Sequence, residues 1–212
     1  MKLDSTNNRP AISERHRKEL LRFLLEKTAA VRMGIKPGEL LRVKHCYETE
    51  NSEGLRYCLY RRDVYETLAL DFVELLTEKE SSLVLFYDRA KLAVTLADPA
   101  NRAILSSEGY PAETSPEGAI AFLGKRFSEN GICHEVGVFV GYPAKDVRGF
   151  MEHLPTTSAH GTPWRIFGDV AESARIASLY RRAERFARET LDSVATIGNF
   201  FDFCNHASYA FK

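Results

Sequence analysis

The residues with the clearest chemical potential lie in one stretch, His134 to Pro143, with the sequence HEVGVFVGYP. A histidine beside a glutamate could perform general acid–base catalysis, because a carboxylate can tune an imidazole near neutral pH. Adjacent residues on a strand point to opposite faces, however, so His134 and Glu135 could cooperate only if the backbone is irregular. Hydrogen bonding at the start of a strand is the simpler interpretation of the pair.

Four further candidates, Tyr87, Asp88, Tyr142 and Asp169, follow segments expected to be strands. In open α/β sheets, ligands bind beyond the carboxyl ends of the strands, where helix N-termini offer free N–H groups to anions. Asp88 and Asp169 also have the sequence position of helix N-caps, which alone would explain them. A tight turn does not require a phenol, so Tyr142 is the candidate that structure explains least.

Arginines follow one another along the last long helix expected, with Arg175, Arg182 and Arg185 near one face. Such a stripe could hold phosphates or an acidic partner, or it could be an ordinary solvated face. Lys and Arg together number 29, as do Asp and Glu, so no net charge favours nucleic acid or anionic lipid. Nucleic-acid binding is therefore not expected.

Cysteine and histidine are neighbours at three places: His45-Cys46, Cys133-His134 and Cys204-Asn205-His206. Zinc accepts such ligands, but no C-x-x-C spacing is present, and cysteine also serves as a small buried hydrophobe. We predict no metal site. The chain contains no G-x-x-x-x-G-K-[ST], G-x-G-x-x-G or G-x-S-x-G motif, so the sequence names no cofactor and leaves open whether the protein is an enzyme.

The elements that must position these residues are predicted from hydrophobic periodicity and capping signals. Apolar runs predict strands at residues 82–87, 135–140 and 164–167, each followed by a helix, with a β-hairpin over residues 40–61. Helices are expected from about residue 13 to Met33, over residues 64–77, after Asp88, Asp98 and Ser115, and over residues 143–154 and 170–192. This alternation predicts an α/β fold with a mixed or largely parallel sheet flanked by helices, an N-terminal helix and the hairpin at an edge.

Length and composition, 212 residues of which 44% are hydrophobic, predict a single α/β domain over residues 12–192. Residues 1–11 are expected to form a flexible polar arm, and residues 193–212 an aromatic C-terminal tail. No apolar signal core precedes the first charges, and no run approaches the roughly 18 apolar residues of a membrane span, so we expect a cytoplasmic protein without membrane contact. Its four cysteines are then expected to be free thiols.

Several of these segments resemble a bacterial family catalogued as domain of unknown function 3793. The resemblance rests on HEVGVFVGYPAKDVRGFMEH at residues 134–153, WRIFGD at 164–169 with Tyr180-Arg181-Arg182, SLVLFYDRAKL with Asp98-Pro99, and the early turn Gly34-Ile35-Lys36-Pro37. Together they cover residues 29 to about 185. The resemblance implies a bacterial cytosolic α/β protein and carries over no catalytic residue.

Two hypotheses of function follow. In the first, the protein binds a small anionic molecule in a crevice at the carboxyl ends of the strands, near Tyr87, Asp88, Tyr142 and Asp169. In the second, it is a non-enzymatic interaction module that uses the aromatic tail and the Arg-rich helix, because clustered exposed aromatic residues mark partner surfaces. A homo-oligomer would fit the second hypothesis.

Overall fold

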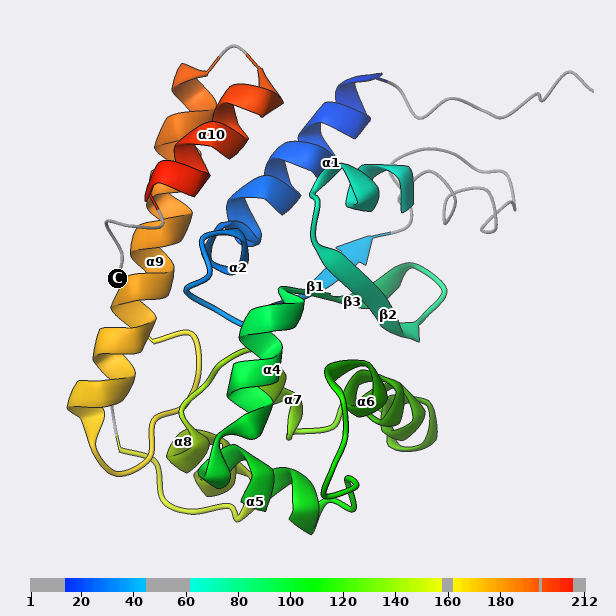
Figure 1. Cartoon of the computed structure of the whole chain (residues 1–212), viewed down its shortest axis with the longest axis vertical. Helices are drawn as coiled ribbons and strands as arrows, with labels where there is room; N and C mark the ends of the chain where they lie inside the picture. The colour runs from blue at the N-terminus through cyan, green and yellow to red at the C-terminus, as the bar shows by residue number, and fades with distance from the viewer. Residues whose placement is uncertain (1–13, 45–61, 158–161, 195, 208–212) are drawn as a thin grey trace, which may run out of the picture.

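The structure, a computed structural model, describes residues 14–44, 62–157, 162–194 and 196–207 (Figure 1). Its strands are β1 (Gly38–Lys44), β2 (Asp71–Thr77) and β3 (Ser81–Tyr87). Its helices are α1 (Glu14–Lys27), α2 (Ala29–Arg32), residues 62–67, α4 (Arg89–Ala97), α5 (Pro99–Ser107), α6 (Pro116–Asn130), α7 (Val136–Phe139), α8 (Ala144–Met151), α9 (Val170–Ser193) and α10 (Ile197–Ala207).

The three described strands form one antiparallel sheet in the order β1-β3-β2. β1 pairs with β3 from Gly38 opposite Tyr87 to Lys44 opposite Ser81. β2 runs back into β3 through a tight turn, where the Glu78 N–H donates to the Ser81 carbonyl at 2.8 Å. β3 is therefore central, and every one of its residues is buried.

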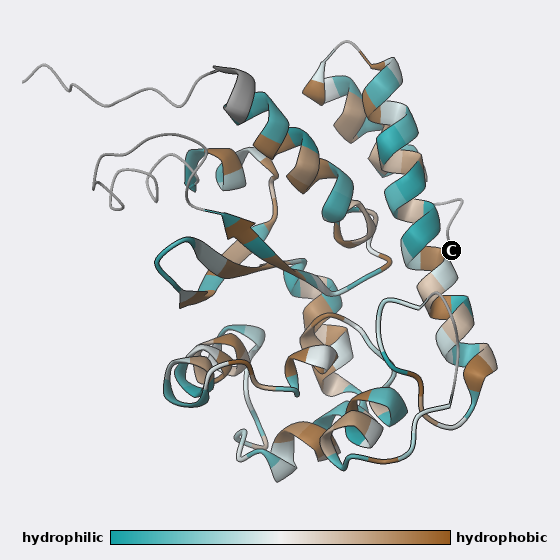
Figure 2. Ribbon diagram, turned by 180° about the vertical axis from the view of Figure 1, so that it is seen from behind, coloured by the Kyte–Doolittle hydropathy of each residue, from teal (hydrophilic) through white to brown (hydrophobic). Residues whose placement is uncertain are grey.

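The side chains of β3 alternate between two hydrophobic cores, because successive residues of a strand point to opposite faces. Val84 and Phe86 belong to the first core, and Leu83, Leu85 and Tyr87 to the second. The sheet thus forms a middle layer between two groups of helices, and its strands are mostly hydrophobic (Figure 2).

The first core lies between the sheet and five helices: α1, α2, the helix of residues 62–67, α9 and α10. α9 runs beside α1, and ion pairs link the two helices: Lys27 Nζ lies 2.5 Å from Glu184 and Arg188 lies 2.6 Å from Glu26. α10 buries Phe200 in this core. The second core lies between the opposite face of the sheet and α4 to α8.

Four helix starts that the sequence predicted are confirmed, each with a side chain that accepts a backbone N–H of the first turn. Asp88 caps α4, Asp98 caps α5, Ser115 caps α6 and Asp169 caps α9. Such caps satisfy N–H groups that have no partner within the helix. The helical segment predicted to end at Met33 is also confirmed, as α1 and α2.

The predicted fold class is wrong. The described residues form a helix-rich structure with a small antiparallel sheet, and not an α/β fold with a mixed or largely parallel sheet. The apolar run at residues 82–87 was correctly predicted to be a strand covered on both faces. Both faces are covered because helices from before and after the sheet pack against it, which does not require parallel strands.

The strands predicted at residues 135–140 and 164–167 are not formed. The first is the helical turn α7, with the Val140 N–H donating to the Val136 carbonyl at 3.1 Å. The second holds one isolated bridge, between Ile166 and Thr157. A short apolar run buried on all sides fits a strand or a helix equally well, so its periodicity could not distinguish them.

The helix predicted over residues 64–77 is correct only in its first part. The chain is helical over residues 62–67, turns at Ala69 with φ of +50°, and continues as β2. Pairing with β3 decides the conformation of residues 71–77. The first strand of the predicted hairpin corresponds to β1, which pairs with β3. The turn and the second strand of that hairpin were predicted within residues 45–61, which lie outside the described residues.

Alanine substitutions of two helical glycines can test how closely α8 packs on Phe167. A Cβ on Gly149 in α8 would lie 2.7 Å from the Cβ of Phe167, whereas the nearest atom to a Cβ on Gly124 in α6 is 4.0 Å away. We expect Gly149→Ala to lower the free energy of unfolding by about 1–3 kcal/mol through overpacking. Gly124→Ala should raise it by about 0.5–1 kcal/mol, since alanine restricts the unfolded chain. Urea denaturation measures both, and stabilisation by both substitutions would contradict the close α8–Phe167 contact.

Candidate functional site

A cavity of about 290 Å³ lies beside α7, α8 and the segment before α9. Its apolar lining comes from Val136 and Gly137 of α7 and from Val147 of α8. His134 and Arg165, which also line it, are exposed, so the cavity is reached from solvent. A largely apolar hollow with a few polar groups is the usual form of a small-molecule site.

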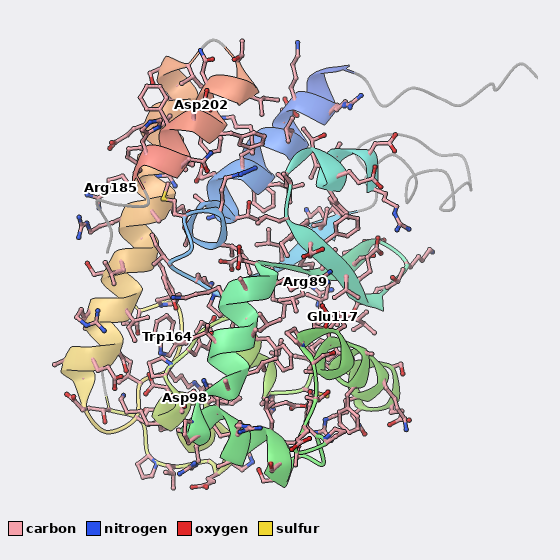
Figure 3. All side chains as sticks on the ribbon, in the orientation of Figure 1. Arg89, Asp98, Glu117, Trp164, Arg185 and Asp202 are labelled. Atoms are coloured by element: carbon pink, nitrogen blue, oxygen red, sulfur yellow. The ribbon has the colours of Figure 1, made fainter. Side chains whose placement is uncertain are left out.

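Aromatic rings in two pairs supply much of the remaining lining. Tyr142 stacks on Trp164, with ring centroids 4.4 Å apart and an interplanar angle of 24°. His134 meets Phe150 edge-on, with centroids 4.8 Å apart and an angle of 77°. Trp164 lies on the segment between α8 and α9 (Figure 3). The rings of both pairs therefore offer a ligand aromatic contacts in addition to apolar surface.

The end of α7 brings His134 and Tyr142 to the same cavity. Gly141 takes a left-handed conformation, with φ of +72°. Its N–H donates to the Val138 carbonyl at 3.1 Å, and the Tyr142 N–H donates to the Gly137 carbonyl at 2.9 Å. This is a Schellman cap, which reverses the chain after the helix. Had residues 135–140 been a strand, His134 and Tyr142 would have been at opposite ends of it.

Asp146 of α8 forms part of the cavity lining, and its buried carboxylate accepts four hydrogen bonds. Its Oδ1 accepts from Lys145 Nζ at 2.8 Å and from the Phe167 N–H at 2.9 Å. Its Oδ2 accepts from the Ser173 hydroxyl at 2.6 Å and from Trp164 Nε1 at 2.8 Å. Burial raises the pKa of Asp146, but these hydrogen bonds outweigh burial and the pKa is lowered overall. Asp146 is therefore charged at neutral pH.

Lys145 completes the network around Asp146. Its Nζ also donates to the Phe167 carbonyl at 2.9 Å and to the Ser173 hydroxyl at 2.7 Å, so all three donors of the ammonium group have acceptors. Ser173 is fully buried and bonded on both sides. The network joins α8, α9 and the segment between them, and its serine is not accessible as a nucleophile.

A third aromatic residue, Tyr180 of α9, supports the turn that follows α7. Its hydroxyl donates to the Gly141 carbonyl at 2.7 Å. Burial raises the pKa of Tyr142 to about 12, and the negative charge of Glu39 adds to the effect. Burial and Glu39 also raise the pKa of Tyr180. Both phenols are therefore neutral at physiological pH, and the hydroxyl of Tyr142 hydrogen-bonds no described residue.

Of the six ligand-binding candidates predicted from the sequence, two line the cavity, His134 and Tyr142, and four do not: Tyr87, Asp88, Glu135 and Asp169. Tyr87 is buried in the second core at the end of β3, where burial raises the pKa of its hydroxyl. Asp88 accepts the Lys91 N–H at 2.6 Å, and Asp169 accepts the Ala171 N–H at 2.9 Å. Both aspartates act as helix caps, and an antiparallel sheet has no common carboxyl edge to gather them.

Glu135 turns away from His134 and from the cavity. Its buried carboxylate lies 2.5 Å from Arg126 Nε and 3.3 Å from the hydroxyl of Tyr110. Arg126 also pairs with Glu108, and its pKa is raised: burial lowers it, but the hydrogen bond and charge of Glu135 outweigh burial. Glu135 thus belongs to an ion pair with Arg126, and its joint use with His134 stays a prediction.

The residues of the predicted interaction surface do not line the cavity. Arg175, Arg182 and Arg185 are exposed, and Arg185 lies on the outer side of α9 (Figure 3). The described part of the predicted tail is α10, which buries Phe200 and Cys204, while Phe203 is 53% exposed. The guanidinium of Arg32 lies 3.7 Å from the ring centroid of Phe201.

Within the described residues, no group of three or more His, Cys, Asp or Glu side chains could hold a metal ion. His45 and Cys46 lie outside those residues. Cys133 and Cys204 are buried free thiols, and burial raises the pKa of both, that of Cys204 to about 11. No described helix is both long enough and apolar enough to span a bilayer.

The family model of the proteins of unknown function DUF3793 matches residues 24–200. The chain belongs to this family. The match confirms the resemblance stated for residues 29 to 185 and extends it at both ends, into α1 and α10. No curated protein and no solved structure shows a significant match. The family description assigns no activity.

Sequence reasoning missed Trp164, Asp146 and Arg165 as site residues. Trp164, the single tryptophan of the chain, and Arg165 both fall in the apolar run that predicts a strand at residues 164–167. Asp146 lies in the first turn of α8, where an acidic residue is favoured by the helix dipole alone. One signal for Asp146 was available. An indole N–H away from water needs an acceptor, and the helix before Trp164 carries a carboxylate, that of Asp146.

The two tyrosines provide a matched test of the site. Tyr180→Phe removes the hydroxyl that donates to Gly141 and should lower the free energy of unfolding by about 1–3 kcal/mol, because the carbonyl loses its partner. Tyr142→Phe removes a hydroxyl without a described partner and should change it by less than about 1 kcal/mol. Chemical denaturation measures both. An equal loss in the two variants would show that the Tyr142 hydroxyl is bonded within the protein.

Proposed function

We propose that the protein binds a small anionic molecule in the cavity beside Trp164. The observation that carries the proposal is a hollow lined by apolar groups and four aromatic rings, with exposed His134 and Arg165 in its lining. Aromatic and aliphatic walls favour an apolar body, and a guanidinium favours a carboxylate or phosphate. The ligand is the kind expected from the sequence, but the cavity is lined by α7, α8 and the segment before α9 and by no residue of a strand.

Arg165 is the residue best suited to the anionic group. Its guanidinium carbon lies 5.6 Å from the ring centroid of Phe150, and it forms no ion pair with a described carboxylate. Its planar guanidinium can bind a carboxylate or a phosphate through two N–H groups at once. Asp146 also lines the cavity, but its charge is already balanced by Lys145 and by three further donors.

The size of the cavity limits the ligand. A volume of about 290 Å³ equals the liquid volume of roughly ten water molecules. A single substituted ring fits within this space, whereas a flavin or a tetrapyrrole would extend out of it into solvent. The free thiols of Cys133 and Cys204 support a reducing compartment such as the cytoplasm.

The alternative function, an interaction module, has less support from the described residues. A cluster of exposed aromatic residues would favour it, but of the three rings in α10 only that of Phe203 is exposed, because Phe200 is buried and Phe201 is half-buried against Arg32. Binding of a partner by the exposed arginines of α9 stays a prediction.

The proposed function can be tested with Trp164 as an intrinsic fluorescent reporter, since the chain has no other tryptophan. Benzoate and phenyl phosphate should change its emission saturably and raise the melting temperature, while benzamide, which is neutral, should bind more weakly. Arg165→Gln should weaken binding of both anions by about two- to fivefold, the range of an exposed ion pair, and added salt should reduce the difference.

Arg148→Gln is the matched control, because Arg148 is an exposed arginine of α8 that does not line the cavity. It should leave the affinity for both anions unchanged. The absence of any change in emission or melting temperature with a panel of single-ring carboxylates and phosphates would contradict the proposal. An equal effect of the two arginine substitutions would show that only the overall charge matters.

A further inference from the structure

The wall of the cavity formed by Trp164 is held in place by one buried group. Trp164 is neither in a helix nor in a strand, so no regular backbone hydrogen bonds fix its position. Its indole N–H donates to Asp146 Oδ2 at 2.8 Å, and the backbone N–H of Phe167, three residues later, donates to Oδ1 at 2.9 Å. The same carboxylate therefore fixes both the ring and the backbone of this segment.

The carboxylate is itself held from two helices. Lys145 of α8 and Ser173 of α9 both donate to it, at 2.8 and 2.6 Å. All four partners of Asp146 are donors, so an amide at this position would turn at least one of its own N–H groups toward another donor. Asp146 is thus specified as a carboxylate by its surroundings.

We propose that Asp146 is a positioning residue that fixes the Trp164 indole in the cavity wall and thereby makes the site selective for anions built on a flat aromatic ring. This inference rests on the proposed function. The stack of Trp164 on Tyr142 and the edge-on pair of His134 and Phe150 give a rigid aromatic lining. A flat ring can make stacked or edge-to-face contacts with such a lining, and a puckered saturated ring cannot.

Benzoate and cyclohexanecarboxylate measure this selectivity, because they share charge and ring size and differ in flatness. The natural protein should bind benzoate about three- to tenfold more tightly, the ratio expected for one or two aromatic contacts. Asp146→Asn should abolish most of this preference. Titration calorimetry, well below the melting temperature of each variant, measures the affinities.

Glu135→Gln is the matched control. Glu135 is also a buried carboxylate, with 2% of its side chain exposed against 1% for Asp146, but it pairs with Arg126 and does not line the cavity. It should lose stability and keep the preference for benzoate. Equal preferences in the Asp146 and Glu135 variants would overturn the inference.

A second readout does not need a ligand. The chain has a single indole N–H, and its exchange with solvent deuterium, followed by NMR, should be slow in the natural protein and in Glu135→Gln but faster in Asp146→Asn. If Asp146→Asn does not fold, Trp164→Phe removes the same hydrogen bond and keeps an aromatic ring, and it should also lose the preference. Full retention of the preference in Trp164→Phe would overturn the inference.

The outcomes separate the two proposals. If the natural protein binds neither acid nor any other single-ring anion, the proposed function fails. Slow indole exchange that depends on Asp146 would then still support the positioning role. If both acids bind equally well, the proposed function stands and the inferred selectivity is wrong.

Discussion

The structure depends on the complete burial of one strand. Every residue of β3 is buried, and its side chains alternate between two hydrophobic cores. A strand of this kind needs cover on both faces, because leaving either row of apolar side chains in water would lose its burial energy. The helices α1 and α2, the helix of residues 62–67, α9 and α10 supply one cover, and α4 to α8 supply the other. The first and the last described helices thus stabilise the same face.

The candidate site lies where the second group of helices meets α9. α7 and α8 are short, and the segment that links α8 to α9 has little regular structure, so hydrogen bonds of side chains replace those of the backbone. Asp146 alone accepts hydrogen bonds from α8, from α9 and from the linking segment. A buried charge is costly unless it is fully paired, and here four donors compensate it. The same arrangement leaves apolar and aromatic side chains around a hollow.

The aromatic residues of α10 were expected at the surface, but the helix packs against the first core and buries part of them. Phe200 and Cys204, four residues apart, lie on one face of this helix and are buried against α2 and α9, whereas Phe203 stays exposed. An aromatic cluster near the end of a chain therefore cannot be assigned to a partner surface from composition alone. Only the place of the helix against the first core decided which rings remain in contact with solvent.

The sequence by itself determined the features that depend on neighbouring residues. The caps at Asp88, Asp98, Ser115 and Asp169 and the buried strand β3 could be predicted, because capping and burial on both faces leave local patterns. The direction of the strands, the helical form of residues 136–139 and the meeting of His134, Tyr142, Asp146 and Trp164 could not. Gly141 and Pro143 fit the end of a helix as well as the end of a strand. Contacts between segments far apart in the chain decided between them, since a short apolar run has no preference of its own.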